Sequence, residues 1–156
     1  MRTFLIGGLL LLGAAPAAAQ ADTTRMFLHP ASRIVWKDGP ASLPKGAQMA
    51  VLEGDPTQAG VFTMRIKFPA GFKVSPHYHS QTEHATVISG ALSLGMGPTF
   101  DKNAMRVLTA GDFGYWVAGT PHFAWFQKET VLQLHGQGPW TITYVNPADD
   151  PRKPVP

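Results

Sequence analysis

Apolar and polar residues alternate in short runs along this chain. In residues 61–68, an apolar side chain at every second position alternates with Thr63, Arg65 and Lys67. A period of two predicts a β-strand with one buried face and one solvated face. The same reasoning places further strands at residues 34–36, 48–52, 83–88, 92–96, 106–108, 113–117, 130–135 and 140–144.

Glycine and proline separate these runs, and no long stretch carries the period of a helix. Residues 38–40, 54–56 and 136–139 are expected turns. Many short strands between such turns predict an all-β sandwich or barrel. The two leading strands are expected to cover an edge of that barrel or to join a neighbouring subunit. Residues 146–156 are expected to form an irregular tail with a solvated end.

The predicted strand at 130–135 leaves one question open. Leu132 and Leu134 lie on one of its faces, and Gln133 and His135 lie on the other. The apolar face is buried in a sandwich, so Gln133 and His135 could face either the barrel lumen or solvent. A lumen position would bring them close to a site inside the barrel.

The first residues resemble a targeting segment rather than part of a fold. Arg2 precedes an apolar run at residues 4–15, which small alanines follow. This order is typical of a secretory signal peptide, and the run is shorter than the roughly 20 residues of a membrane span. We therefore expect a signal peptide at residues 1–21 and one domain at residues 22–156. The protein would be periplasmic or secreted, with no stable membrane anchor after cleavage.

The composition narrows the chemistry. The chain has no cysteine, which excludes disulfides, iron–sulfur clusters, thiolate zinc sites and a cysteine nucleophile. Its 13 Lys and Arg residues and 10 Asp and Glu residues are scattered. The sequence has no run of basic residues that would predict binding to nucleic acid or to a membrane surface. The length after removal of the leader fits a single domain with its own core.

His77 and His79 are the clearest candidate metal ligands. In a strand both point to the same face, with Cα atoms about 6.6 Å apart, so two ring nitrogens can converge on one ion. Residues 80–82 can form a tight reversal, and Glu83 then opens a strand that can return to the same face. Two imidazoles and one carboxylate suit a divalent first-row metal. A lone His-x-His pair is also common at surfaces and in cores, and His84 is expected on the opposite face.

The spacing around these residues resembles the first conserved signature of the cupin superfamily. That signature consists of a glycine, five residues, His-x-His, three residues, a glutamate, six residues and a glycine, and residues 71–90 match it throughout. Residues 111–126 resemble the second signature, with both glycines and His122 in register. Val117 and Phe126 depart from it, because the family usually has proline and asparagine there.

The resemblance implies a fold and a ligand set. The fold is a single cupin barrel, also described as a double-stranded β-helix or jelly roll, with N-terminal edge strands and an irregular C-terminal tail. The chain is similar to small secreted single-domain cupins, cupin-2-like and mostly without an assigned activity. One divalent transition metal, Fe, Mn, Ni or Zn, is implied, and its implied ligands are His77, His79, Glu83 and His122.

The same resemblance implies a metal-dependent enzyme that acts on a small oxygenated organic molecule by dioxygenase-, isomerase- or lyase-type chemistry. Glu83 would act as ligand or base, and His135 would be an outer proton carrier if it points inward. Phe126, four residues beyond His122 on the same face, and Gln133 are candidate pocket residues. The alternative is a non-catalytic cupin that binds metal and a small ligand, or acts as a sensor. A homodimer is a further expectation.

Overall fold

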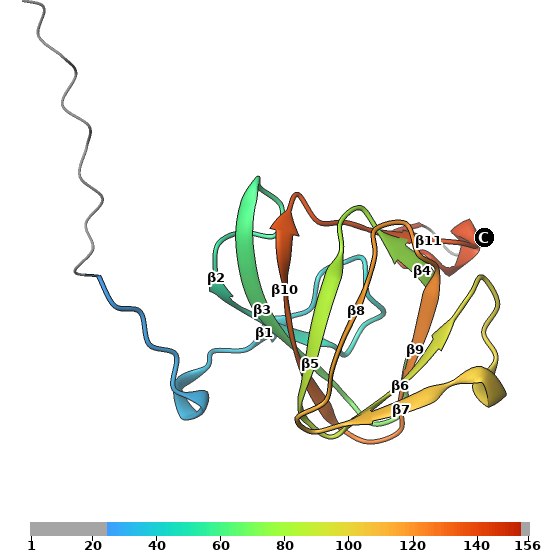
Figure 1. Cartoon of the computed structure of the whole chain (residues 1–156), viewed down its shortest axis with the longest axis horizontal. Helices are drawn as coiled ribbons and strands as arrows, with labels where there is room; N and C mark the ends of the chain where they lie inside the picture. Colours follow the sequence, from blue (N-terminus) through green and yellow to red (C-terminus); the bar gives the residue numbers. More distant parts are fainter. Residues whose placement is uncertain (1–24, 154–156) are drawn as a thin grey trace, which may run out of the picture.

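Two antiparallel β-sheets face each other in the computed structural model, which describes residues 25–153 (Figure 1). The first sheet has the order β1 (Lys37–Asp38), β2 (Gln48–Glu53), β3 (Gly60–Phe68), β10 (Thr130–Gly138), β5 (Glu83–Ser89) and β8 (Phe113–Trp116). The second has the order β11 (Ile142–Tyr144), β4 (Phe72–His79), β9 (His122–Phe126), β6 (Ala91–Met96) and β7 (Arg106–Thr109). Three short 3₁₀ helices complete the described chain: η1 (Ala31–Arg33), η2 (Lys102–Ala104) and η3 (Pro147–Asp149).

This arrangement confirms the predicted all-β jelly-roll barrel, with β1 and β2 at one edge of the six-stranded sheet. No helix within residues 25–153 has both the length and the apolar character needed to span a bilayer. The predicted signal peptide at residues 1–21 lies outside the described residues.

The core fills the space between the two sheets. The alternation in β3 places Phe62, Met64 and Ile66 inside, each at most 3% exposed. Met64 and Ile66 pair across the sheet with Leu134 and Leu132 of β10. Burying one side chain of this kind stabilises the fold by about 1.5–3 kcal/mol. The stability of the barrel therefore rests on apolar residues rather than on the polar side chains of the site described below.

Two sequence predictions about strands are wrong. Residues 136–139 do not begin with a turn, because β10 continues to Gly138, which pairs with Gly60. A Cβ atom on Gly138 would clash with the backbone carbonyl of Gln58, so this glycine permits a close approach of two chains. Residues 34–36 are not a strand either, since β1 begins only at Lys37.

The C-terminal tail is irregular as far as residue 153, as predicted, but Arg152 is not simply solvated. Arg152 is ion-paired with Asp150 at 2.7 Å and donates a hydrogen bond to the carbonyl oxygen of Ile142 at 3.1 Å. The tail is thus attached to β11.

Candidate metal centre

A β-bulge in β4 turns two histidines into the barrel. Phe72 and Val74 are buried, so strict alternation would place Pro76 inside and His77 outside. The register between β4 and β9 shifts between Val74 and His77, and a bulge resets the alternation. Pro76 lies within the shift, where its lack of an N–H costs no ladder bond. His77 and His79 are consequently only 5% and 4% exposed.

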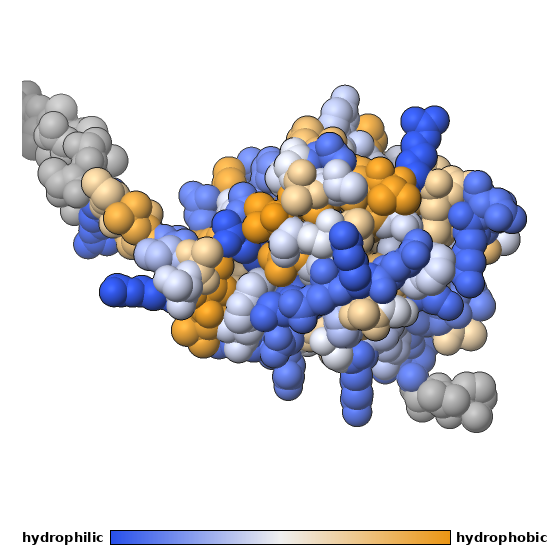
Figure 2. Space-filling model, turned by 90° about the horizontal axis from the view of Figure 1, so that it is seen from below, coloured by the Kyte–Doolittle hydropathy of each residue, from blue (hydrophilic) through white to orange (hydrophobic). Residues whose placement is uncertain are grey.

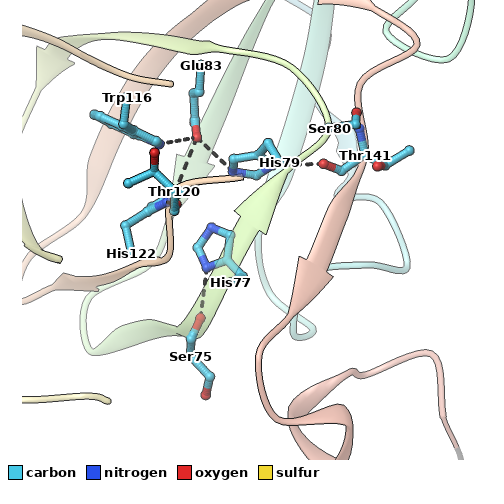
Figure 3. A network of polar contacts seen from close by, with 9 residues as sticks. All are labelled: Ser75, His77, His79, Ser80, Glu83, Trp116, Thr120, His122 and Thr141. Carbon is cyan, nitrogen blue, oxygen red and sulfur yellow. Dashed lines mark hydrogen bonds and ion pairs between the residues drawn. The ribbon is translucent and has the colours of Figure 1, made fainter. Parts of the chain in front are cut away.

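Three histidines meet at one point inside the barrel (Figure 3). His77 pairs directly with His122 across the β4–β9 ladder, and their ring centroids lie 4.2 Å apart. His79 follows on β4, and one ligand nitrogen from each of the three rings lies within 4.8 Å of the other two. All three side chains are buried. The structure therefore brings together the three imidazoles that the sequence singled out.

Each of these rings is oriented by a backbone carbonyl. The three Nδ1 atoms donate to the carbonyl oxygens of Ser75 (2.8 Å from His77), Thr141 (3.0 Å from His79) and Thr120 (2.9 Å from His122). A carbonyl can only accept, so each neutral ring carries its proton on Nδ1 and keeps a lone pair on Nε2. This is the arrangement by which metal-ligating histidines are held in orientation and tautomer.

Two of the three orienting contacts are local and share a sequence pattern. Ser75 and Thr120 each precede a proline and then the histidine that they orient, so Ser-Pro-His and Thr-Pro-His repeat one device. Proline keeps the residue before it extended. In this conformation the carbonyl oxygen of that residue can accept a hydrogen bond from the imidazole two residues later. This repeated tripeptide is a signal in the sequence that our reasoning missed.

Glu83 lies against two of the imidazoles. Its Oε2 atom is 2.7 Å from Nε2 of His79 and 3.5 Å from Nε2 of His122. The same oxygen accepts a hydrogen bond of 2.8 Å from Nε1 of Trp116. Burial opposes ionisation of Glu83, but the interactions with the neighbouring His79 and His122 outweigh it, so the pKa of Glu83 is lowered.

The contact between His79 and Glu83 tests whether the residues fit a metal. Nδ1 of His79 already donates to a carbonyl, so a neutral ring presents a lone pair at Nε2, and this buried atom has no hydrogen-bond partner among the described residues. An ionised carboxylate 2.7 Å away also presents only lone pairs. Two acceptors at that distance need a proton or a metal ion between them. A divalent transition metal fits this place, and three imidazoles with one carboxylate suit it.

His77 is kept in the neutral form that such a ligand needs. Burial is the main cause, and the neighbouring His122 and His79 add to it, so the pKa of His77 falls from 6.5 to about 3. Near neutral pH its lone pair is therefore available without loss of a proton.

A cavity of about 60 Å³ adjoins the imidazoles. Apart from the site itself, its walls are mostly aliphatic and aromatic, drawn from both sheets. Phe126 lines it and stacks on Phe68, with ring centroids 3.9 Å apart and planes 7° from parallel. The structure thus places Phe126 in the cavity wall beside the site.

The comparisons with known proteins agree with this architecture. The family model described as a domain of unknown function (DUF4437) matches residues 13–143. This chain is a cupin of the DUF4437 family. No curated protein matches its sequence.

Solved structures show the same fold as this DUF4437 cupin. A putative acetylacetone dioxygenase from Methylibium petroleiphilum PM1 is 20% identical, with a TM-score of 0.63 over 85% of this chain and 90% of that one. The acetylacetone dioxygenase from Acinetobacter johnsonii is 15% identical, with a TM-score of 0.63 over 85% and 86%. The polyketide cyclase RemF from Streptomyces resistomycificus is 16% identical, with a TM-score of 0.63 over 82% and 91%. At these identities the similarity establishes the fold alone.

Two predicted site residues lie outside the barrel of this cupin. Gln133 and His135 share the outer face of β10, because Leu132 and Leu134, which alternate with them along the strand, are buried in the apolar interior. Gln133 accepts a hydrogen bond from Arg65 at 3.1 Å, and His135 stacks on His84 with ring centroids 4.9 Å apart. The pocket role of Gln133 and the catalytic role of His135 are therefore corrected. His84 is on the outer face, as expected.

Sequence reasoning missed two tryptophans of this DUF4437 cupin. Trp116 holds Glu83, and Trp140 stacks on His79 with ring centroids 4.0 Å apart and planes 16° from parallel. Both line the cavity. Trp116 reaches Glu83 through the β5–β8 pair, which joins strands far apart in the chain, so no local pattern could have predicted the contact.

Proposed function

We propose that this cupin is a metal-dependent enzyme that acts on a small oxygenated organic molecule. One observation carries the proposal: the Nε2 atoms of three buried histidines converge beside Glu83, and each opposite Nδ1 is fixed by a carbonyl. A site that only packed a core would not need three oriented lone pairs aimed at one point.

His77, His79 and His122 would hold the metal, and Glu83 would complete the set. A bound Fe, Mn, Ni or Zn ion would supply Lewis-acid or oxygen-activating chemistry at this site. The residues of the chain provide the surroundings in which this chemistry would take place. The apolar walls exclude water, which strengthens electrostatic interactions inside the cavity.

Glu83 is the candidate base for any proton transfer. The titratable residues that line the cavity are the three histidines and Glu83. The histidines have both nitrogens assigned, one to a carbonyl and one to the metal, so Glu83 alone has a carboxylate oxygen to spare. Trp116 holds Oε2, which leaves Oε1 to accept a proton from a bound molecule.

The cavity limits the substrate. A volume of about 60 Å³ and apolar walls favour a small molecule with a hydrocarbon body. Two structural neighbours bear the name acetylacetone dioxygenase and one the name polyketide cyclase, which makes small diketones and related keto compounds the first candidates for dioxygenase-type chemistry.

A non-catalytic metal-binding or sensor cupin is the second candidate. It is favoured by the absence, among the residues that line the cavity, of any acid or base beyond the ligand set itself. A carrier needs no group that can move a proton, whereas in an enzyme of this type Glu83 would have to act both as metal ligand and as base.

Turnover assays separate the two candidates. Protein loaded separately with Fe, Mn, Ni or Zn would be assayed for oxygen consumption and product formation with small diketones, catechols and flavonols. We expect turnover with at least one metal, its loss in Glu83→Gln, and its retention in the outer-face control Gln133→Ala. Thermal shifts on ligand binding without turnover under any metal would instead favour the carrier.

We also propose that residues 1–21 direct export and are removed. The supporting pattern is the positive residue, short apolar run and small residues at the start of the chain. N-terminal sequencing of the protein recovered from the periplasm or medium tests this. A start near residue 22 is expected, and an intact Met1 on a cytoplasmic protein would contradict it.

A further inference from the structure

One hydrogen-bond donor on the cavity wall has no acceptor. The indole of Trp140 lines the cavity, and its Nε1 atom is buried without a hydrogen-bond partner among the described residues. A buried N–H group in that position has given up its bond to water and gained nothing in return. Hydrophilic residues cover much of the outer surface (Figure 2), but the cavity wall is mostly aliphatic and aromatic. An unpaired N–H in this wall therefore points to a molecule that binds there.

The other side-chain N–H groups on this wall are already used. Nδ1 of each of the three histidines donates to a backbone carbonyl, and Nε1 of Trp116 donates to Glu83. Among the described residues that line the cavity, Trp140 is thus the one that keeps a side-chain N–H for a ligand. An indole N–H can only donate, so its partner must be an acceptor such as a carbonyl or carboxylate oxygen.

The segment that carries Trp140 is held in place on both sides. It joins β10 of the six-stranded sheet to β11 of the five-stranded sheet (Figure 1). The backbone N–H of Trp140 donates to the carbonyl oxygen of Pro56 at 2.7 Å. The N–H of Thr141 donates to the Ser80 hydroxyl at 2.9 Å, and that hydroxyl donates to the carbonyl oxygen of Pro139 at 3.1 Å. These bonds fix the position of the indole before a ligand arrives, which lowers the cost of binding.

The same segment places the indole beside the proposed metal centre. Trp140 stacks on His79 with ring centroids 4.0 Å apart, and the carbonyl oxygen of Thr141 accepts a hydrogen bond from Nδ1 of that imidazole. A hydrogen bond from Nε1 spans only about 2.7–3.2 Å. An oxygen atom that the indole holds therefore lies close to His79 rather than beside Phe126, which is at the other end of β9 from His122.

We propose that Nε1 of Trp140 donates a hydrogen bond to an oxygen of the molecule bound in the cavity and so sets the orientation in which that molecule binds. This inference rests on the proposed function, because it concerns the ligand of the same cavity. It narrows the ligand class to molecules that carry an acceptor oxygen on a small hydrocarbon body, such as ketones. Ammonium ions and pure hydrocarbons would leave the Trp140 N–H unpaired.

NMR of nitrogen-labelled wild-type protein tests this directly. The chain has four tryptophans, and the variants Trp36→Phe, Trp116→Phe and Trp125→Phe assign the Trp140 indole signal by elimination. Metal-free and zinc-loaded protein would be titrated with butanone and, separately, with the alkene in which a CH₂ group replaces its carbonyl oxygen. We expect butanone to move the Trp140 indole proton signal downfield to a saturating value, and the alkene not to do so. An unchanged signal with butanone, or equal shifts with both molecules, would overturn the proposal.

A variant measures the same hydrogen bond as an affinity. Trp140→Phe keeps an aromatic ring against His79 but lacks the N–H. The loss of one neutral hydrogen bond should weaken the binding of butanone relative to the alkene by about 2–12-fold. Trp125→Phe, which changes a tryptophan outside the cavity lining, should leave this ratio of affinities unchanged. A wild-type ratio in Trp140→Phe would overturn the proposal.

This inference and the proposed enzyme can fail separately. Turnover of a diketone in a protein whose Trp140 signal does not distinguish butanone from the alkene would overturn the role of Trp140 and leave the enzyme. A selective response of the Trp140 signal without turnover under any metal would support the role of Trp140 and contradict the enzyme.

Discussion

Trp116 and Glu83 face each other across the β5–β8 pair, and the indole Nε1 donates to the carboxylate Oε2 at 2.8 Å. An indole N–H can only donate, so it stabilises the ionised carboxylate over the acid. The oxygen that it holds is also 2.7 Å from Nε2 of His79. Trp116 therefore positions the one anionic donor of the proposed metal centre without reaching the metal itself.

Replacing Trp116 by phenylalanine should weaken metal binding. The ring would still fill its place, but Glu83 would lose a hydrogen bond that fixes Oε2. Losing such an outer partner lowers metal affinity by about 10–100-fold, and losing a hydrogen bond to a charged group costs about 1.5–3 kcal/mol of stability. Competitive metal titration and urea unfolding measure the two effects. Trp125→Phe is the control, because Trp125 lies on the same sheet as the histidines but is hydrogen-bonded to none of them. Equal metal affinities for the two variants would contradict the role of Trp116.

Removing an inner histidine should strip the metal but leave the fold. Alanine at His77, His79 or His122 should reduce metal content, measured by mass spectrometry after dialysis, to a small fraction of the wild-type value. The far-ultraviolet spectrum should stay unchanged, since none of the three histidines belongs to the apolar core. His135→Ala, on the outer face, is the matched control. Loss of metal from the control but not from the triad variants would mean that the site lies elsewhere.

The metal-free protein should become less stable as the pH falls. His77 takes up a proton at about 6.5 when unfolded but only at about 3 when folded, so the unfolded state binds more protons between these values. The free energy of unfolding therefore rises with pH in this window and loses the contribution of His77 as the pH falls through it. Urea midpoints of chelator-treated protein measure this slope. His77→Gln should flatten it, and a variant with the wild-type slope would rule out His77 as its source.

Phe126 should be important both for stability and for the size of the cavity. Phe126→Ala removes a ring that is 1% exposed and stacks on Phe68, which should cost about 3–5 kcal/mol. The enlarged cavity should bind bulkier apolar ligands than the wild type does, as measured by ligand-induced thermal shifts. Phe113→Ala, with a ring 54% exposed on β8, should have little effect on either property. A loss below 1 kcal/mol for Phe126→Ala would show that the ring is not part of the packed wall.

Much of the fold could be predicted because its strands carry a clean alternation. In β3 the period of two marks the buried side chains directly, and the strand is found where it was expected. The prediction failed at Gly138, where glycine allows two backbones to approach and does not mark a turn. Composition alone does not distinguish these two uses of glycine.

The site was less predictable than the fold. Spacing indicated His77 and His79, but a bulge is needed to turn them inward relative to Val74, and a bulge is set by pairing with β9. The direction of His135 depended on whether the lumen is polar or dry, which is a property of the closed barrel. The structure shows an apolar interior that leucines occupy, and His135 is on the outside for that reason.

The most direct test of the central claim is anomalous diffraction from crystals of the metal-loaded protein. We expect one strong peak inside the barrel, about 2.0–2.2 Å from Nε2 of His77, His79 and His122, with a carboxylate oxygen of Glu83 beside it. A peak at any other group of residues, or an ion bound through Nδ1 after the carbonyl contacts have broken, would contradict it.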